Sequence, residues 1–120
     1  MKILIVDDSK AMRMIVSRTL KQAGFNGHTM LEASNGVEAL AKIEQETPDI
    51  VLSDWNMPEM KGIELLAKVR EAGHILRFGF ITSESSTDAR KLAHELGAEF
   101  LLTKPFNVES LQAALEHVLH

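Results

Sequence analysis

Five polar residues have side chains that together could carry out phosphoryl transfer, although they are far apart along the chain. They are Asp7, Asp8, Asp54, Thr82 and Lys104. A carboxylate can attack phosphorus as a nucleophile, and neighbouring carboxylates suit a hard divalent cation such as Mg²⁺. An ammonium group and a hydroxyl can each contact phosphoryl oxygens. The question is therefore whether the fold brings the five residues together.

Each of these residues ends or follows a short run typical of a buried β-strand. The five predicted strands are Lys2–Val6, Thr29–Ala33, Asp49–Ser53, Phe78–Thr82 and Glu99–Thr103. Four of them are nearly continuous apolar stretches, as expected for strands of a parallel sheet that is covered on both faces. The second run is the least regular of the five.

Helical periods of apolar residues separate the strands. Helix starts are predicted from capping spacings, at Asn35 with Glu38, at Ser85 with Asp88, and at Asn107. Helix ends are predicted at Gly24, Gly73 and Gly97. Five strands alternating with five helices predict an α/β, doubly wound three-layer sandwich. Right-handed crossovers place the carboxyl ends of all strands along one edge, where the polar residues would meet.

Taken singly, each polar residue has an ordinary structural explanation. An aspartate after a strand often forms a turn, and a lysine is usually exposed. Their joint position at the strand ends favours a functional site. Two carboxylates ~5 Å apart repel by roughly 3 kcal/mol at an effective dielectric of about 20, so the cluster needs a counter-charge. We therefore expect Asp7 and Asp8 to hold Mg²⁺ and Asp54 to be the phosphoacceptor.

The composition sets limits on the class of protein. The chain has 120 residues, a formal net charge of −4 and no cysteine. Disulfide frameworks and thiolate chemistry are excluded, and an acidic chain argues against nucleic-acid binding as the main task. No apolar stretch reaches the length of a membrane span, and no secretion signal precedes the first strand, so we expect no membrane insertion and a cytoplasmic location.

The motifs around these residues resemble those of response regulator receiver domains. They read Ile-Val-Asp7-Asp8-Ser, Val-Leu-Ser-Asp54-Trp-Asn-Met-Pro, Phe-Ile-Thr82-Ser-Glu and Leu-Leu-Thr-Lys104-Pro. The resemblance extends over residues 1–120 as one receiver domain, and it is greatest to the family's stand-alone regulators of chemotaxis. It implies a flavodoxin-like fold with a parallel five-stranded sheet of order 2-1-3-4-5.

The resemblance also implies roles for individual residues. Asp54 would accept phosphate from a sensor histidine kinase, and the backbone carbonyl of Asn56 would join the aspartates as a Mg²⁺ ligand. Thr82 and Lys104 would contact the phosphoryl group, and Glu84 and Asn56 would tune autodephosphorylation. The bond before Pro105 would be cis. Such a protein catalyses its own phosphorylation and dephosphorylation without being a conventional enzyme.

The resemblance implies an output by protein–protein contact. We expect the loop after Thr82 and the following helix to move, and the Asp88–His120 region to bind the downstream target. We expect no output domain after residue 120 unless the chain is a fragment of a larger regulator, and this expectation favours the interpretation.

The sequence departs from the family at one position of the switch. Leu101 occupies the place where many members have tyrosine or phenylalanine, and Phe100 comes one residue earlier. Adjacent strand residues point to opposite faces, so Phe100 cannot substitute for that aromatic. Three further predictions concern loops: Trp55 is expected to be exposed, and Gly36 and Gly62 are expected to lie in turns.

Two other functions remain as alternatives. An aspartyl-phosphate phosphohydrolase would share the nucleophile, metal and lysine, but it would normally need an acid/base carboxylate where Asn56 stands. A docking module that is never phosphorylated would not need all five polar residues.

Overall fold

The strands form where apolar residues are continuous, and the helices form where these residues recur with helical spacing. The computed structural model describes residues 1–119, without the side chains of His117 and Leu119. The strands are β1 (Lys2–Val6), β2 (Thr29–Ala33), β3 (Ile50–Ser53), β4 (Arg77–Thr82) and β5 (Phe100–Thr103). The helices are α1 (Lys10–Leu20), α2 (Gly36–Glu46), α3 (Gly62–Glu71), α4 (Thr87–Glu95) and α5 (Val108–Leu119). All five predicted strands and five predicted helices are confirmed, with small shifts at their ends.

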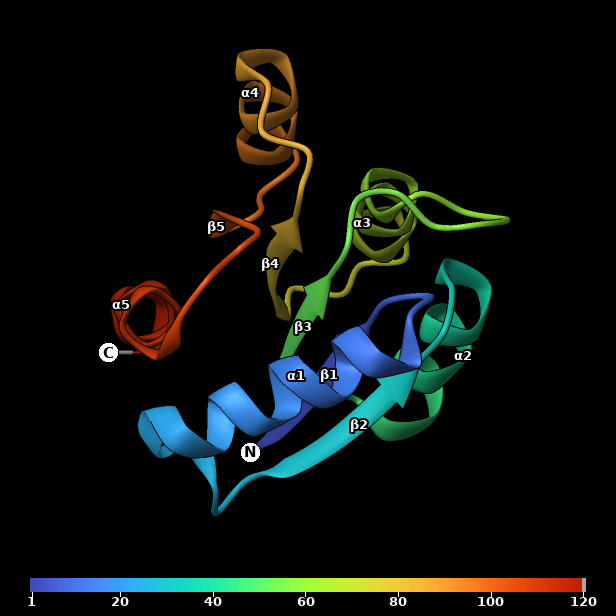
Figure 1. The fold of residues 1–120 in the computed structure, drawn as a ribbon. Helices are drawn as coiled ribbons and strands as arrows, with labels where there is room; N and C mark the ends of the chain where they lie inside the picture. Colours follow the sequence, from blue (N-terminus) through green and yellow to red (C-terminus); the bar gives the residue numbers. More distant parts are fainter. Residues whose placement is uncertain (120) are drawn as a thin grey trace.

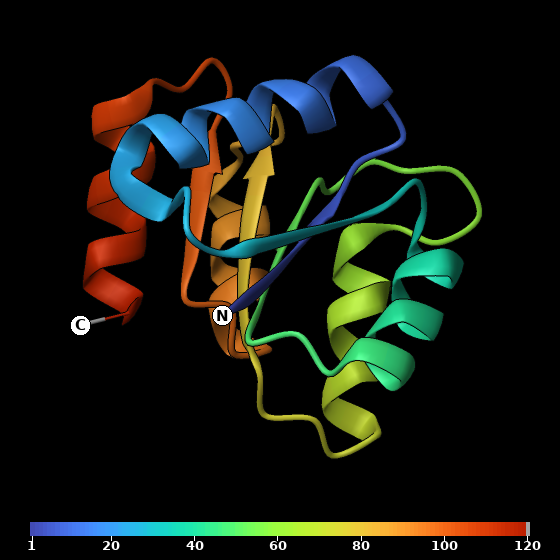
Figure 2. The ribbon, with the colours of Figure 1, turned by 90° about the horizontal axis from the view of Figure 1, so that it is seen from below.

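The strands form one parallel sheet with the order β2-β1-β3-β4-β5. Helices α1 and α5 cover one face, and α2, α3 and α4 cover the other (Figures 1 and 2). This arrangement is the predicted doubly wound, flavodoxin-like sandwich. The register places Val6 opposite both Ala33 and Ser53, and Thr82 opposite Thr103, so the strands end at a common edge.

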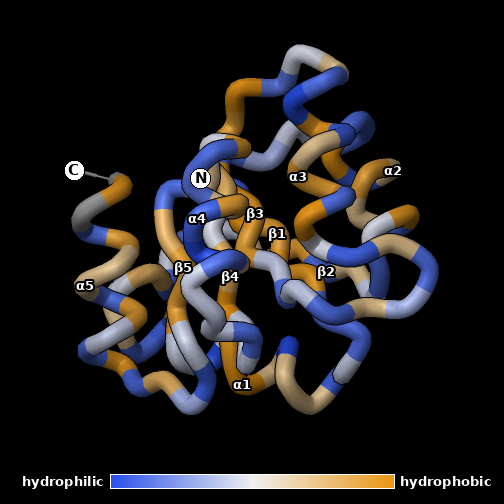
Figure 3. Tube along the Cα trace, turned by 90° about the horizontal axis from the view of Figure 1, so that it is seen from above, coloured by the Kyte–Doolittle hydropathy of each residue, from blue (hydrophilic) through white to orange (hydrophobic). Residues whose placement is uncertain are grey.

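The sheet divides the core into two layers. Fully buried side chains of the central strands alternate between them, Leu4 and Val51 toward α2 and α3, and Ile3 and Ile50 toward α1 and α5. The central strands are accordingly apolar along their length in Figure 3. Burial of this apolar surface is the main force that holds the strand ends in place.

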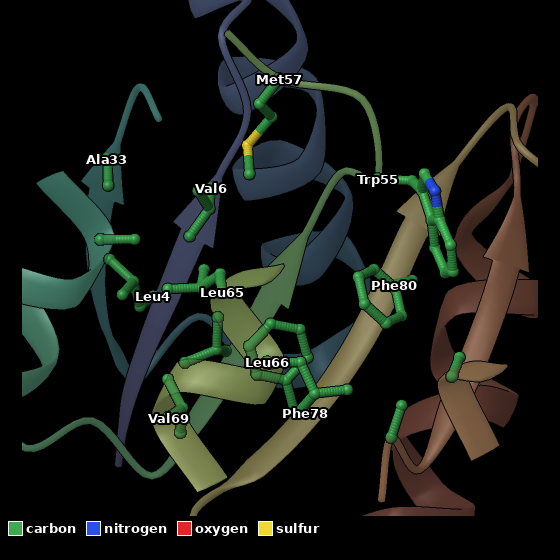
Figure 4. Close-up of a cluster of buried hydrophobic side chains, with 14 of the residues drawn as sticks. Leu4, Val6, Ala33, Trp55, Met57, Leu65, Leu66, Val69, Phe78 and Phe80 are labelled. Atoms are coloured by element: carbon green, nitrogen blue, oxygen red, sulfur yellow. The ribbon is translucent and has the colours of Figure 1, made fainter. Parts of the chain in front are cut away.

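Trp55 is buried, which corrects the expectation of an exposed ring. Its exposed fraction is 8%, and its ring centroid lies 5.0 Å from that of Phe80. Figure 4 shows the indole lying beside Phe80 at the end of β4. Burying so large an apolar ring outweighs the loop position that favoured exposure, because aromatic side chains gain most from leaving water.

The two glycines predicted in turns are the first residues of helices, which corrects that prediction. Gly36 begins α2 and Gly62 begins α3. A Cβ on Gly62 would collide with the carbonyl oxygen of Asp54 and lie 2.9 Å from a ring carbon of Phe80. The absence of a side chain therefore lets the start of α3 pack directly against the end of β3.

The helix caps agree with the sequence in two cases and differ in one. The side chain of Asn35 accepts from the Glu38 amide at 2.8 Å, and that of Asn107 accepts from the Ser110 amide at 2.8 Å. For α4, the prediction of Ser85 is wrong, because Ser86 accepts from the Ala89 amide at 3.1 Å. Adjacent serines carry the same capping chemistry, so the sequence pattern alone does not separate them.

The predicted helix ends have the left-handed backbone that favours glycine. Gly24, Gly73 and Gly97 have φ values of 104°, 85° and 89°. A π-helical turn (Lys21–Phe25) extends α1 beyond Leu20 and contains the first of these glycines.

Arg70 near the end of α3 connects three segments at the amino ends of the strands. Its Nη1 donates to the carbonyl oxygens of His74 and Leu76 at 3.1 and 2.7 Å, and its Nη2 donates to that of Gly97 at 3.0 Å. These bonds satisfy carbonyls in the segments that lead into β4 and β5. Among residues 1–119, no helix has the length and apolar character needed to cross a lipid bilayer.

Candidate functional site

Three aspartates meet at the carboxyl edge of the sheet, as their positions after β1 and β3 predicted. Carboxylate oxygens of Asp7, Asp8 and Asp54 all lie within 4.8 Å of one another. Asp7 is buried, Asp54 is half-buried and Asp8 is exposed, so the cluster has a closed inner part and an open outer part. The fold therefore provides an acidic pocket that a molecule in solution can reach.

Lys104 places its ammonium group between two of these carboxylates. Its Nζ lies 3.1 Å from Asp7 Oδ2 and 3.4 Å from Asp54 Oδ2. The lysine side chain is 18% exposed, and the two aspartate side chains are 6% and 12% exposed. The bond between Lys104 and Pro105 is cis, as the family resemblance implied.

Thr82 is fully buried at the end of β4. Its hydroxyl oxygen accepts a hydrogen bond from the Glu84 amide at 3.1 Å, and its carbonyl accepts one from the Lys104 amide at 2.8 Å. Thr82 is thus joined through the backbone both to the lysine of the pocket and to the loop that begins α4. A structural change at the acidic pocket can therefore reach that loop through the covalent and hydrogen bonds of Thr82.

The acceptor candidate Asp54 is held in a defined orientation. Its Oδ1 accepts from the Trp55 amide at 2.7 Å, while its Oδ2 faces Lys104. Its carbonyl oxygen accepts from the Ser53 hydroxyl at 2.8 Å. One carboxylate oxygen is therefore fixed by the backbone, and the other lies in the shared acidic pocket.

The surroundings of Asp7 disfavour the charged form of its carboxylate. Burial raises the pKa of Asp7 above its ordinary value, and the neighbouring Asp54 adds to this effect. The Ser9 amide, which donates to Asp7 at 2.9 Å, and the Lys104 ammonium act in the opposite direction without cancelling the rise. The contacts of Asp7 thus do not fully offset the effect of burying its carboxylate.

The residues present fit a hard divalent cation. Three carboxylates with oxygens this close form a donor set that Mg²⁺ prefers, and their excess negative charge matches a doubly charged ion. Asn56 lies two residues after Asp54 in the loop that leads to α3, with its side chain exposed. Asp7, Asp8 and Asp54 are the residues that would hold the ion.

The comparison with known families agrees with this geometry. The response regulator receiver domain family matches residues 3–116. The chain belongs to this family. The resemblance inferred from the motifs, and the fold that it implied, are thereby confirmed.

Relatives of this receiver domain include proteins of chemotaxis. It is 38% identical over 122 residues to the chemotaxis protein CheY1 of Helicobacter pylori, covering 99% of this chain and 97% of the relative. A solved structure of the chemotaxis protein CheY4 of Vibrio cholerae superposes with a TM-score of 0.86 at 38% identity, covering 98% and 97% of the two chains. The response regulator MprA of Mycobacterium ulcerans is 36% identical over 118 residues, and this chain spans 50% of its length.

Glu84 lies where α4 begins, which gives the rate-tuning candidate of this receiver domain a structural position. Its Oε1 accepts from the amide of Ser86, the residue that caps α4, at 3.3 Å. Glu84 is half-buried, two residues beyond Thr82. Its carboxylate is therefore engaged with the helix start in this conformation.

Leu101 and Phe100 of the receiver domain point to opposite faces of the sheet, as their adjacency predicted. Leu101 packs with the core layer beneath α4, whereas Phe100 packs with the layer beneath α5. Phe100 stands opposite Gly79, where a Cβ would overlap its ring. The aromatic ring thus fills the space that glycine leaves in β4 and has no access to the α4 side.

Two arginines of this site region were not identified from the sequence. Arg13 of α1 donates to the Asp7 carbonyl at 2.6 Å and pairs with Glu32 of β2 at 2.8 Å. Arg90 of α4 donates to the carbonyl of Leu101 at 3.3 Å and to the hydroxyl of Thr103 at 2.8 Å. Each contact joins a helix to a residue outside that helix, so helical periodicity carries no signal for it.

Proposed function

We propose that this receiver domain accepts a phosphoryl group on Asp54 from the phosphohistidine of a sensor kinase. The observation that carries the proposal is the convergence of Asp7, Asp8, Asp54 and Lys104 in one accessible pocket. Under this proposal, residues 1–120 act as one receiver domain in the cytoplasm.

The proposed reaction follows from the groups around Asp54. A carboxylate oxygen of Asp54 attacks the phosphorus, the bond from phosphorus to the donor nitrogen breaks, and the imidazole leaves with the electron pair and takes up a proton. Lys104, which already contacts Asp54 Oδ2, then neutralises part of the charge of the aspartyl phosphate. A Mg²⁺ ion bound by the aspartates would offset the remaining negative charge on the phosphoryl oxygens.

The proposed output is a change in a protein-binding surface. Thr82 is joined to Lys104 and to the loop before α4, so we propose that its hydroxyl turns toward the phosphoryl group and shifts that loop. The responding surface comprises α4, β5 and α5, within the predicted Asp88–His120 region, of which His120 lies outside the described residues. The similarity to CheY1 favours a target in chemotaxis.

The test is covalent modification by a small phosphodonor. With Mg²⁺ and acetyl phosphate, the intact mass should rise by one phosphoryl group, and the Asp54→Asn variant should show no such gain. Asp49→Asn is the matched control, because Asp49 precedes the same strand whose end carries Asp54. It should be modified as the unaltered protein is.

The same measurement distinguishes the alternatives. Continuous turnover of varied phosphomonoesters would favour a phosphohydrolase, and the absence of a covalent product with every donor would favour a docking module. Transfer from a phosphorylated histidine kinase domain, lost in Asp54→Asn, then tests the partner.

A further inference from the structure

Helix α1 and the turn that follows it have a net positive charge, whereas the whole chain has a net negative charge. Residues 10–25 contain four basic residues and no acidic ones, within a chain of net charge −4. The basic residues are Lys10, Arg13, Arg18 and Lys21. Arg13 pairs with Glu32, whereas Arg18 and Lys21 form no ion pair within residues 1–119. Lys10, Arg18 and Lys21 are therefore exposed and unpaired among the described residues, and the last two lie one helical turn apart near the end of α1.

These two cations border a groove between α1 and β2. The groove has a volume of about 410 Å³ and is lined by Met14, Ser17, Arg18 and Lys21 from α1 and its following turn, and by Glu32 from β2. Met14 is 52% exposed, which is unusual for a large apolar side chain beside a cavity. The groove thus offers one apolar contact followed by two positive charges along successive turns of one helix face.

The strand that contributes Glu32 to the groove lies at the edge of the sheet. β2 is the outermost strand of the sheet, so its outer side has no strand partner among the described residues. Helix α1 runs beside this strand in Figures 1 and 2. An extended segment can add to such an edge through backbone hydrogen bonds, while its alternate side chains contact the neighbouring helix.

The spacing of Met14, Arg18 and Lys21 along α1 determines which residue types an extended segment would need in order to match them. At a rise of 1.5 Å per residue, Arg18 and Lys21 lie about 6 and 10 Å from Met14 along the helix axis. Side chains on one face of an extended segment repeat about every 6.8 Å. An apolar residue at one position and acidic residues two and four positions later would therefore match Met14, Arg18 and Lys21, with the long lysine side chain spanning the small difference.

We propose that the groove between α1 and β2 binds an extended acidic segment of a partner protein with this apolar-x-acidic-x-acidic pattern. The segment pairs with the edge of β2, its apolar side chain covers Met14, and its carboxylates meet Arg18 and Lys21. A nucleic acid is a poorer match, because a run of phosphates needs more than the two cations that line the groove. The proposal does not depend on phosphorylation of Asp54.

A defined peptide tests the proposal. The probe has seven residues and blocked ends, with leucine at position 2, glutamate at positions 4 and 6, and threonine elsewhere. In a titration followed by amide NMR shifts, the peptide should perturb the amides of 29–33 and 14–21 at low salt. Affinity should fall about tenfold or more between 20 and 300 mM NaCl, because exposed charges are screened over this range. A peptide with lysine at positions 4 and 6 should not bind.

Two double variants of equal charge change provide the control. Arg18→Glu with Lys21→Glu should weaken binding of the acidic peptide at least tenfold, because each cation becomes a repelling carboxylate. Lys68→Glu with Lys91→Glu alters exposed lysines of α3 and α4 and should leave the affinity within about twofold. Met14→Ser should weaken binding of the acidic peptide, while the dependence of the affinity on NaCl concentration should stay unchanged.

Several outcomes would overturn the proposal. These are the absence of binding at millimolar peptide, equal losses in both double variants, and perturbed amides that map to α4 and α5. Tighter binding of a 20-residue thymidine oligonucleotide at the same residues would identify a nucleic-acid surface instead. The mass gain with acetyl phosphate is measured on the same variants, so a failure of this proposal is distinguishable from a failure of the phosphoacceptor function.

Discussion

The three aspartates of the pocket have different surroundings, and Asp7 is the one that is buried. It shares Lys104 with Asp54, so desolvation acts on it with only partial compensation, and its pKa is raised. Bringing these carboxylates together lowers the stability of the fold and creates a strong negative field, as is common in functional sites.

The raised pKa of Asp7 predicts a specific pH dependence of stability. As pH rises between the ordinary pKa of an aspartate and the raised pKa of the folded state, the unfolded chain loses this proton first. The folded protein then binds more protons than the unfolded one, so the free energy of unfolding falls with rising pH. In chelator, urea unfolding should show Asp7→Asn gaining stability relative to the unaltered protein across this window.

The control for this prediction is Gly27→Ala, which removes no titratable group. Its stability relative to the unaltered protein should stay constant through that window. A constant difference between Asp7→Asn and the unaltered protein at all pH values would contradict the assignment of the effect to burial of Asp7.

At the scale of elements, the site depends on how closely β3 and α3 approach each other. Gly62 stands against the carbonyl of Asp54, and its amide donates to the carbonyl of Trp55 at 2.9 Å. This contact closes the loop that carries Asn56. The geometry of Asp54 and of the adjacent loop is therefore fixed by a residue that has no side-chain functional group.

Replacing Gly62 should damage both stability and the site. In Gly62→Ala the added methyl group meets the backbone of β3, which cannot rotate away, and the expected cost is about 3 kcal/mol in the free energy of unfolding. Gly27→Ala is the matched control, because a Cβ there meets nothing within 4 Å, and its effect should stay within about 0.5 kcal/mol. Chemical denaturation measures both, and equal stabilities would show that the close approach is not required.

The connection between Thr82 and α4 predicts a variant that is phosphorylated but does not switch. Thr82→Val keeps the size of this buried side chain and removes the hydroxyl, which accepts from the Glu84 amide. Acetyl phosphate should still produce the mass gain, while the phosphorylation-dependent NMR shifts in α4 and β5 should be reduced by at least half. Undiminished shifts in this variant would place the switch elsewhere.

The elements could be predicted from the sequence because their signals are local. Continuous apolar runs identified the strands, and the strand order followed from the family resemblance. The position of the Trp55 ring, the choice of Ser86 over Ser85 and the packing of Gly62 depend on neighbours from other elements. The contacts of Arg13 and Arg90 likewise arise only once helices and strands are packed, so they could not be read from spacing.

At the scale of the whole molecule, the carboxylate cluster should make stability depend on divalent cations. A cation that binds the folded protein alone, at a concentration 100 times its Kd, adds about 2.7 kcal/mol, which corresponds to a rise in Tm on the order of 10 °C. Calorimetry with Mg²⁺ and with chelator at matched ionic strength measures this difference. Asp8→Asn should lose most of the rise, and Asp49→Asn should keep it, whereas equal Tm values with and without Mg²⁺ would refute a cation site.

Arg70 links segments at the amino ends of the strands, at the opposite end of the sheet from the acidic pocket. Its three bonds tie the end of α3 to the segments that enter β4 and β5, far from the acidic pocket. A displacement of α4 that starts at Thr82 is thus restrained near Gly97 by Arg70, and near its first turn by the bonds from Arg90 to Leu101 and Thr103 of β5. If the helix moves, the Arg90 bonds must break while those of Arg70 hold its carboxyl end, so its first turn should shift most.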